Sequence, residues 1–140
     1  MFCAQCGVEN DVLGSFCKTC GVALEMSKAV SFSDAISLAF KNYVNFKGRS
    51  TRAEYWWFFL FTFTLSAITE AIDVFSSLGI MSTIFSLIVF MPSLTVGVRR
   101  LHDINKSGGW ILMWFVPIVG WVLLIVWYTR RSDEGINRYG

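Results

Sequence analysis

Two long uncharged stretches dominate the pattern of hydrophobic and polar positions along this chain. Residues 74–98 and residues 107–129 contain no acidic, basic or histidine side chain. A helix needs about 20 mostly apolar residues to cross a bilayer, because each residue adds about 1.5 Å of length. Both stretches are long enough, so each predicts a membrane-spanning helix.

A third apolar stretch, residues 55–69, ends at Glu70. It reaches the required length only if the helix continues through Glu70 toward Ile72. With that continuation, the pattern predicts an all-α membrane protein, a three-span helical bundle. The expected spans are about 54–72, 78–98 and 109–128.

Composition agrees with this class. Hydrophobic residues make up 54% of the chain and aromatic residues 16%, and the mean hydropathy is +0.53. These values exceed what the core of a soluble domain requires. Buried core helices are disfavoured as an alternative, because a 140-residue chain cannot enclose three such helices in water.

A shorter amphipathic helix is expected before the first span, over about residues 32–44. Ser31, followed three residues later by Asp34, is typical of a helix N-terminus. An apolar stripe at helical spacing follows: Phe32, Ile36, Ala39, Phe40 and Tyr43. This interfacial helix can lie on the membrane surface or pack against the rest of the protein, and both hold if it caps the bundle.

The next segment marks the entry into the membrane. Gly48 ends the helical pattern, and Thr51 with Glu54 forms a capping box that opens the first span. Basic side chains at headgroup level are then followed by an aromatic belt. These are Lys47, Arg49 and Arg52, and then Tyr55, Trp56 and Trp57.

All four cysteines lie in an internal repeat at the start of the chain. Phe2–Val8 reads FCAQCGV, and Phe16–Val22 reads FCKTCGV. This spacing lets two Cys-x2-Cys turns converge on one tetrahedral ion. We therefore predict a structural zinc ribbon over residues 1–24 and a linker over residues 25–31. The Zn²⁺ ligands would be Cys3, Cys6, Cys17 and Cys20.

A closed shell of four cysteines leaves no position for a catalytic water, so the predicted zinc is structural. Two disulfides are the alternative, and they need an oxidising compartment. Residues 1–30 contain no apolar run of the length that a secretory signal needs, which favours a cytoplasmic N-terminus and zinc. That segment contains two basic residues, Lys18 and Lys28, and three acidic residues. Nucleic acid is therefore disfavoured, and the ribbon is expected to bind a protein partner.

Basic residues are unevenly distributed around the expected spans. Several precede the first span, whereas the connection to the second contains only the acidic Glu70 and Asp73. Arg99, Arg100 and Lys106 follow the second span. The positive-inside rule therefore places the N-terminal region and the loop after the second span in the cytoplasm.

The last uncharged stretch allows two arrangements. A continuous third span fits the bracketing aromatic residues Trp110 and Trp127, and this is the expectation, although it puts the arginines of the C-terminal tail outside. The rival is a re-entrant hairpin broken at Pro117–Gly120, which returns the tail to the cytoplasm. In the rival, the exposed backbone would need protein partners.

A charged segment, Val98–Trp110, separates two apolar stretches and holds the only histidine. Arg99 and Asp103 are four residues apart on one helical face and can pair. One interpretation is a self-satisfied polar plug at the cytoplasmic end of the bundle. The other is a pocket for an anionic lipid headgroup or a phosphorylated ligand. Its candidate residues are Arg49, Arg52, Arg99, Arg100, His102 and Asp103.

An enzyme is disfavoured. His102 beside Asp103 can act as an oriented general base, but no serine or cysteine is placed as a recognisable nucleophile. Apart from Glu70 near one end, the polar residues within the expected spans are hydroxyls, which serve helix packing more often than solute transport.

Four segments of the chain carry a family resemblance. They read FKGRSTRAEYWW (46–57), RRLHD with SGGW (99–110), PIVG (117–120) and GINRYG (135–140). In kind and order they resemble the DUF805 family of small bacterial inner-membrane proteins, over about residues 32–140. The resemblance implies a small helical inner-membrane protein, and the family's name states that its biochemical function is unassigned. The paired FCxxCGV pattern also resembles the short zinc-ribbon modules at the ends of many bacterial membrane and regulatory proteins.

Together these features predict a non-catalytic, multi-pass membrane adaptor or sensor whose cytoplasmic ribbon contacts a protein partner. The alternative is a small transport or anionic-lipid-handling component. Three spans make a thin wall for a pore, so the alternative requires a homo-oligomer.

Overall fold

The computed structural model describes residues 19, 30–76, 79–133 and 137–139. The chain divides into two compact units, Met1–Val30 and Ser31–Gly140. The four cysteines of the predicted zinc ribbon, and most of the predicted linker, fall outside the described residues. The ribbon therefore stays a prediction, and the fold below is that of the second unit.

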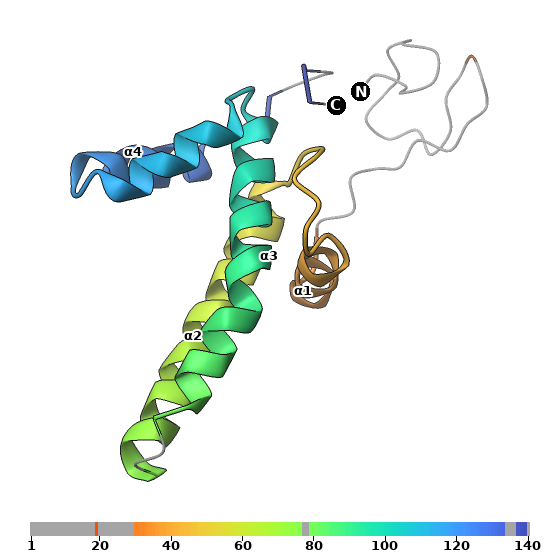
Figure 1. The fold of residues 1–140 in the computed structure, drawn as a ribbon. Helices are drawn as coiled ribbons and strands as arrows, with labels where there is room; N and C mark the ends of the chain where they lie inside the picture. Colours follow the sequence, from red (N-terminus) through yellow and green to blue (C-terminus); the bar gives the residue numbers. More distant parts are fainter. Residues whose placement is uncertain (1–18, 20–29, 77–78, 134–136, 140) are drawn as a thin grey trace. The chain divides into compact units, whose positions relative to one another are not determined.

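The second unit is helical, and its described residues contain no strand. Its elements are α1 (Phe32–Lys41), α2 (Arg52–Ser76), α3 (Met81–Asp103), the 3-10 helix η1 (Gly108–Phe115) and α4 (Val119–Thr129). Helices α2 and α3 run side by side in opposite directions (Figure 1). The predicted all-α class is confirmed for this part of the chain.

Helices α2 and α3 are both long and apolar enough to cross a membrane. Only 11% of the most apolar window of α2, and 28% of that of α3, is buried within the protein. Phe63, Phe75 and Leu87 are among the large side chains that stay exposed. A soluble protein would bury its most apolar helices, so these surfaces suit a lipid environment.

The α2–α3 turn is closed by an acidic residue. As the sequence required, α2 continues through Glu70. Asp73 then accepts hydrogen bonds from the backbone amides of Met81, at 3.0 Å, and Ser82, at 2.8 Å. The first amides of a helix lack partners within the helix, so this carboxylate completes the start of α3.

Helix α1 packs against α2 and α3. The predicted start is confirmed, because Ser31 and Asp34 form a reciprocal capping box. Ala35 and Ala39 are fully buried. After the helix, the Tyr43 hydroxyl donates to the Ile88 carbonyl at 2.8 Å. Pro92 has no N–H to offer that carbonyl four residues earlier, so Tyr43 supplies the missing donor.

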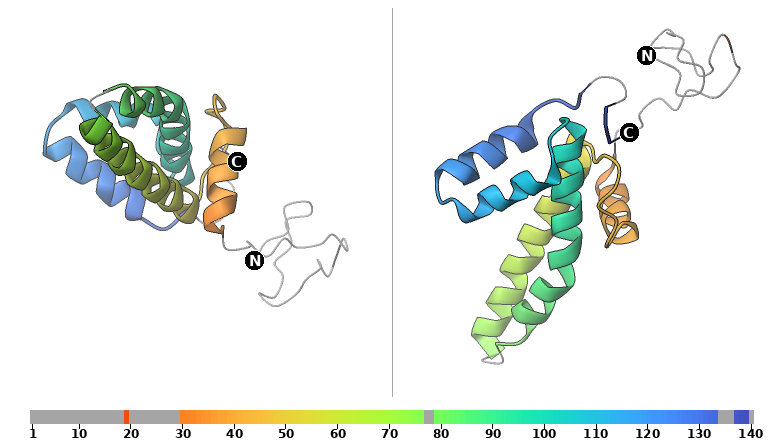
Figure 2. Two further views of the ribbon diagram at one scale, coloured as in Figure 1. Left: turned by 90° about the horizontal axis from the view of Figure 1, so that it is seen from below. Right: turned by 45° about the horizontal axis from the view of Figure 1, so that its top comes forward.

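The prediction of a continuous third span over 109–128 is wrong. The chain forms η1, turns at Pro117–Ile118, and returns as α4, which has only 11 residues. This η1–α4 hairpin projects sideways from the end of α3, and both views in Figure 2 agree. The rival arrangement, a hairpin broken at Pro117–Gly120, is the one observed.

Local chemistry explains the reversal. Ile118 has φ 64° and ψ −69°, and the Val119 amide donates to the Pro117 carbonyl at 2.8 Å, which defines a γ-turn. Gly120 lets the two arms approach each other, because a Cβ at this position would lie 1.9 Å from the Met113 carbonyl oxygen. Any other residue would collide with backbone there.

We predict that Gly120→Ala destabilises the hairpin by about 1–3 kcal/mol, because the new methyl group forces the two arms apart. Gly109→Ala is the matched control, since its Cβ would meet only the Ser107 hydroxyl at 3.7 Å. Thermal unfolding in neutral detergent measures both. Equal melting temperatures for the two variants would contradict the close approach at Gly120.

Candidate functional site

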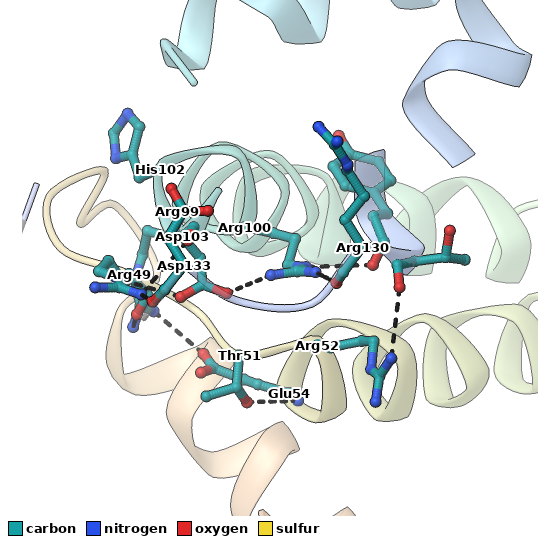
Figure 3. A network of polar contacts seen from close by, with 12 residues as sticks. Arg49, Thr51, Arg52, Glu54, Arg99, Arg100, His102, Asp103, Arg130 and Asp133 are labelled. Atoms are coloured by element: carbon teal, nitrogen blue, oxygen red, sulfur yellow. Dashed lines mark hydrogen bonds and ion pairs between the residues drawn. The ribbon is translucent and has the colours of Figure 1, made fainter. Parts of the chain in front are cut away.

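Charged side chains from distant segments meet where α2 begins and α3 ends (Figure 3). We call the following six residues the arginine network: Arg49, Arg52, Glu54, Arg99, Arg100 and Asp103. Arg49 comes from the loop before α2, Arg52 and Glu54 from the first turn of α2, and the others from the last turns of α3. The structure thus brings together segments that lie about fifty residues apart in the sequence.

Asp103 is the centre of the network. One carboxylate oxygen accepts from Nε of Arg49 at 3.0 Å, and the other accepts from Nη1 of Arg100. The Asp103 side chain is 4% exposed, and that of Arg100 is fully buried. A carboxylate at such depth is expensive unless it is paired, and here two guanidinium groups share it.

Arg100 also binds the end of α4. Its Nε donates to the Tyr128 carbonyl at 3.2 Å, and its Nη2 donates to the Arg130 carbonyl. The last carbonyls of a helix have no donor within the helix, and a cation suits that end of the helix dipole. Arg100 therefore fastens the returning hairpin to α3.

The C-terminal tail adds to this attachment. The Asp133 amide donates to the Asp103 carbonyl at 3.0 Å, and the Asp133 carbonyl accepts from Arg49 at 2.6 Å. Asn137 donates to the His102 carbonyl at 2.9 Å. The tail thus lies against the loop before α2 and the end of α3.

Arg99 pairs with Glu54, not with Asp103 as the sequence suggested. The distance between Nη1 of Arg99 and Oε1 of Glu54 is 3.3 Å, and Nη2 donates to the Arg49 carbonyl at 3.1 Å. The predicted pairing at four-residue spacing is wrong, because the neighbouring helix offers Arg99 a closer carboxylate. Thr51 still accepts from the Glu54 amide at 3.2 Å, as its predicted capping role requires.

His102 faces the tail. Its ring stacks on Tyr139, with ring centres 3.8 Å apart and planes 3° apart. Its Nδ1 lies 3.3 Å from the Gly48 carbonyl. Both oxygens of Asp103 accept from arginines, so in the described residues His102 and Asp103 do not form the oriented pair of a general base.

Arg52 differs from the other arginines of the network. It is exposed, and its contact is a 3.5 Å hydrogen bond to the Thr129 carbonyl. Among the residues that the structure describes, no carboxylate pairs with Arg52. The candidate anion-binding residues therefore share one end of the unit, but all three nitrogens of Arg100 and both Nη atoms of Arg99 already donate to protein groups.

Sequence reasoning missed several partners in this cluster. Glu54 was assigned only a capping role, and the carbonyls of Thr129, Arg130 and Asp133 went unnoticed. The GINRYG segment was the available signal, because Asn137 and Tyr139 both contact His102. Carbonyl partners leave no mark in a sequence, since every residue has one.

Neither the network nor its surroundings offers a metal centre. In residues 30–76, 79–133 and 137–139, no group of three or more His, Cys, Asp or Glu side chains could hold a metal ion. The predicted zinc site thus depends entirely on the cysteines outside those ranges.

Comparison with known proteins now identifies the family. The family model described as "Protein of unknown function (DUF805)" matches residues 43–140, which include the whole network. The chain belongs to the DUF805 family. The match starts after the cysteine repeat, so the four cysteines lie outside the family region.

Inner membrane protein YhaI of Escherichia coli K12 is 42% identical over 102 residues, which cover 71% of this chain and 86% of YhaI. Inner membrane protein YhaH of the same strain is 40% identical over 106 residues, which cover 71% of this chain and 88% of YhaH. The uncharacterized protein YiiR matches at 33% over 81 residues, 57% of this chain and 53% of YiiR. No solved structure is significantly similar. The two relatives named as inner membrane proteins and the two long apolar helices identify a membrane protein.

We predict that removing Glu54 alone destabilises the DUF805 unit by about 3–5 kcal/mol, because Arg99 is left buried and unpaired. Replacing Arg99 and Glu54 together by leucine should recover much of that loss of stability. The cycle of Arg99→Leu and Glu54→Leu should therefore show strong coupling in thermal unfolding. The control cycle of Arg99→Leu and Asp103→Leu should show weaker coupling. A stronger coupling in this control cycle than in the cycle with Glu54 would contradict the observed pairing.

Proposed function

We propose that this DUF805 protein is a non-catalytic adaptor or sensor of the bacterial inner membrane. Residues 32–140 anchor it as a multi-pass protein, with α2 and α3 crossing the bilayer and the arginine network at the cytoplasmic end. The N-terminal cysteine segment binds one structural Zn²⁺ and contacts a protein partner. The η1–α4 hairpin lies at the cytoplasmic face, within the interfacial region.

One observation carries the proposed orientation: the tail returns to the network end of the unit. Arg100 and Arg49 bind carbonyls of Arg130 and Asp133, so the basic tail lies with the basic loops. The other end of α2 carries Glu70 and Asp73 instead. A continuous third span conflicted with the positive-inside rule, and the hairpin removes that conflict.

The contacts within the network support an architectural role. Arg100 is fully buried and its three nitrogens donate to protein groups, and Asp103 is held between two guanidinium groups. Groups that bind substrate must exchange their partners during a reaction. Groups that join four segments of one unit are better suited to hold that unit rigid, so that it can anchor an attached module such as the cysteine segment.

The cysteine segment suits an attached module. Thiolates are preferred zinc ligands, and two Cys-x2-Cys pairs complete a tetrahedral shell. A segment of some twenty residues has too small a core to fold alone, so metal binding would supply the missing free energy. Its balance of lysine and acidic residues favours a protein partner over nucleic acid.

Reporter fusions test the orientation. We expect a fluorescent protein at the C-terminus to be active in the cytoplasm, and alkaline phosphatase inserted after Ser76 to be active in the periplasm. The first result follows from the hairpin, and the second from the α2–α3 turn. The matched control moves phosphatase to the C-terminus, where it should be inactive. Active phosphatase there would contradict the proposed topology.

Metal analysis tests the module. Protein purified without added oxidant should carry one zinc per chain, and Cys17→Ser should release it because a tetrahedral shell loses one ligand. The variant should still insert in the membrane, since Ser31–Gly140 form a separate unit. Proximity labelling from the N-terminus should lose its main target in the same variant. Intact disulfides without zinc would contradict this assignment.

A lipid-handling role is the second candidate, and one feature favours it. An apolar cavity lies beside the network, under the η1–α4 hairpin. Transport through a pore would require a homo-oligomer, which a native mass in nanodiscs would reveal.

A further inference from the structure

Outside the network, a partly open cavity of about 630 Å³ is lined by α2, α3 and the η1–α4 hairpin. Its size falls in the range of about 300–1,000 Å³ that is usual for small-molecule sites. The walls are mostly aromatic and aliphatic. They include Trp56, Phe59, Leu94, Trp114, Trp121 and Leu124.

The walls favour an extended apolar ligand. On α2 they run from Tyr55 to Thr62, and on α3 from Phe90 to Gly97, so the cavity follows the helices for roughly 10 Å. Two of the wall hydroxyls are already committed, because Thr62 donates to the Phe59 carbonyl at 3.0 Å and Ser93 to the Val89 carbonyl at 2.6 Å. A polar ligand would find few partners here, whereas a hydrocarbon chain needs none.

A cation lies beyond one end of this cavity and is not part of its walls. Arg52 lies one helical turn before Trp56 on the same face of α2, and it touches the α4 carbonyl of Thr129. Its guanidinium group is exposed and has no carboxylate partner among the described residues. The surrounding network holds four arginines and two carboxylates, so the local potential is positive.

The expected depth of the cavity in the membrane also favours a lipid ligand. If Arg52 lies at headgroup level, Thr62 lies roughly 15 Å deeper along α2, which is about half of the hydrocarbon thickness. The cavity would therefore sit within one leaflet, with its cationic end at the surface. A phospholipid has the same order of groups, with a phosphate above an acyl chain.

We propose that the cavity holds an acyl chain of one anionic phospholipid from the surrounding bilayer, with its phosphate at Arg52. This proposal deepens the lipid-handling candidate and rests on the membrane placement, but not on the zinc module. The η1–α4 hairpin covers the chain, so the lipid is retained instead of exchanging freely with the bilayer. Of the predicted anion-binding residues, only Arg52 serves the phosphate.

Native mass spectrometry tests the proposal on full-length protein from nanodiscs of equal phosphatidylglycerol and phosphatidylcholine. Wild type should retain one lipid, with phosphatidylglycerol favoured by about fivefold, the preference that one arginine confers. Arg52→Gln should retain a lipid without that preference. Arg131→Gln, an exposed arginine of the tail, is the matched control and should behave as wild type.

Ser93→Phe fills the cavity from α3 and should abolish retention, and Thr62→Phe does the same from α2. Ser86→Phe, on α3 but outside the cavity, should retain the lipid. Thermal unfolding identifies any variant that fails to fold. If only one of Ser93→Phe and Thr62→Phe folds, that variant alone is enough for the test. Equal retention in Ser93→Phe and Ser86→Phe would overturn the proposal. So would a wild-type dimer without lipid, because a second copy would then occupy the cavity.

Discussion

The burial of Arg100 against Asp103 is the interaction on which the rest of the unit depends. A fully buried guanidinium group needs partners within the protein, and each nitrogen of Arg100 has one. These partners are a carboxylate on its own helix and two carbonyls at the end of α4. Meeting this requirement draws the chain back after Pro117. Asp103 in turn binds Arg49, which holds the loop before α2. A single buried charge pair thus joins three segments: α3, the end of α4 and the loop before α2.

That attachment has consequences for the membrane. Because α4 returns to the end of α3, the uncharged stretch 107–129 does not cross a bilayer as one helix. It forms a hairpin whose outer surface is almost entirely apolar, with Leu112, Phe115 and Ile118 all more than half exposed. Such a surface suits the boundary between headgroups and acyl chains. The hairpin also forms one wall of the apolar cavity, so the network determines the shape of the proposed lipid site.

The sequence predicted the elements whose signals are local. Uncharged stretches with flanking charges predicted α2 and α3, and the spacing of Ser31 and Asp34 predicted the start of α1. The hairpin was harder, because a stretch of apolar residues looks alike whether it spans or turns, and Pro117 with Gly120 marked only a rival arrangement. Five of the six network residues were among the candidates that the sequence offered, whereas Glu54 was assigned only a capping role. Arg49 and Asp103 are 54 residues apart. Helical periodicity cannot reveal such a contact, and it favoured Asp103 over Glu54 as the partner of Arg99.

Hydrogen–deuterium exchange of Arg100→Gln in nanodiscs tests most directly whether the η1–α4 hairpin depends on Arg100. Loss of the guanidinium group removes the donors to the Tyr128 and Arg130 carbonyls but leaves the contacts between α2 and α3. If the hairpin depends on Arg100, amides in α4 and residues 130–133 should exchange about tenfold faster or more, while those in the membrane halves of α2 and α3 should be unchanged. Unchanged exchange in α4, or an equal increase throughout the unit, would contradict this dependence.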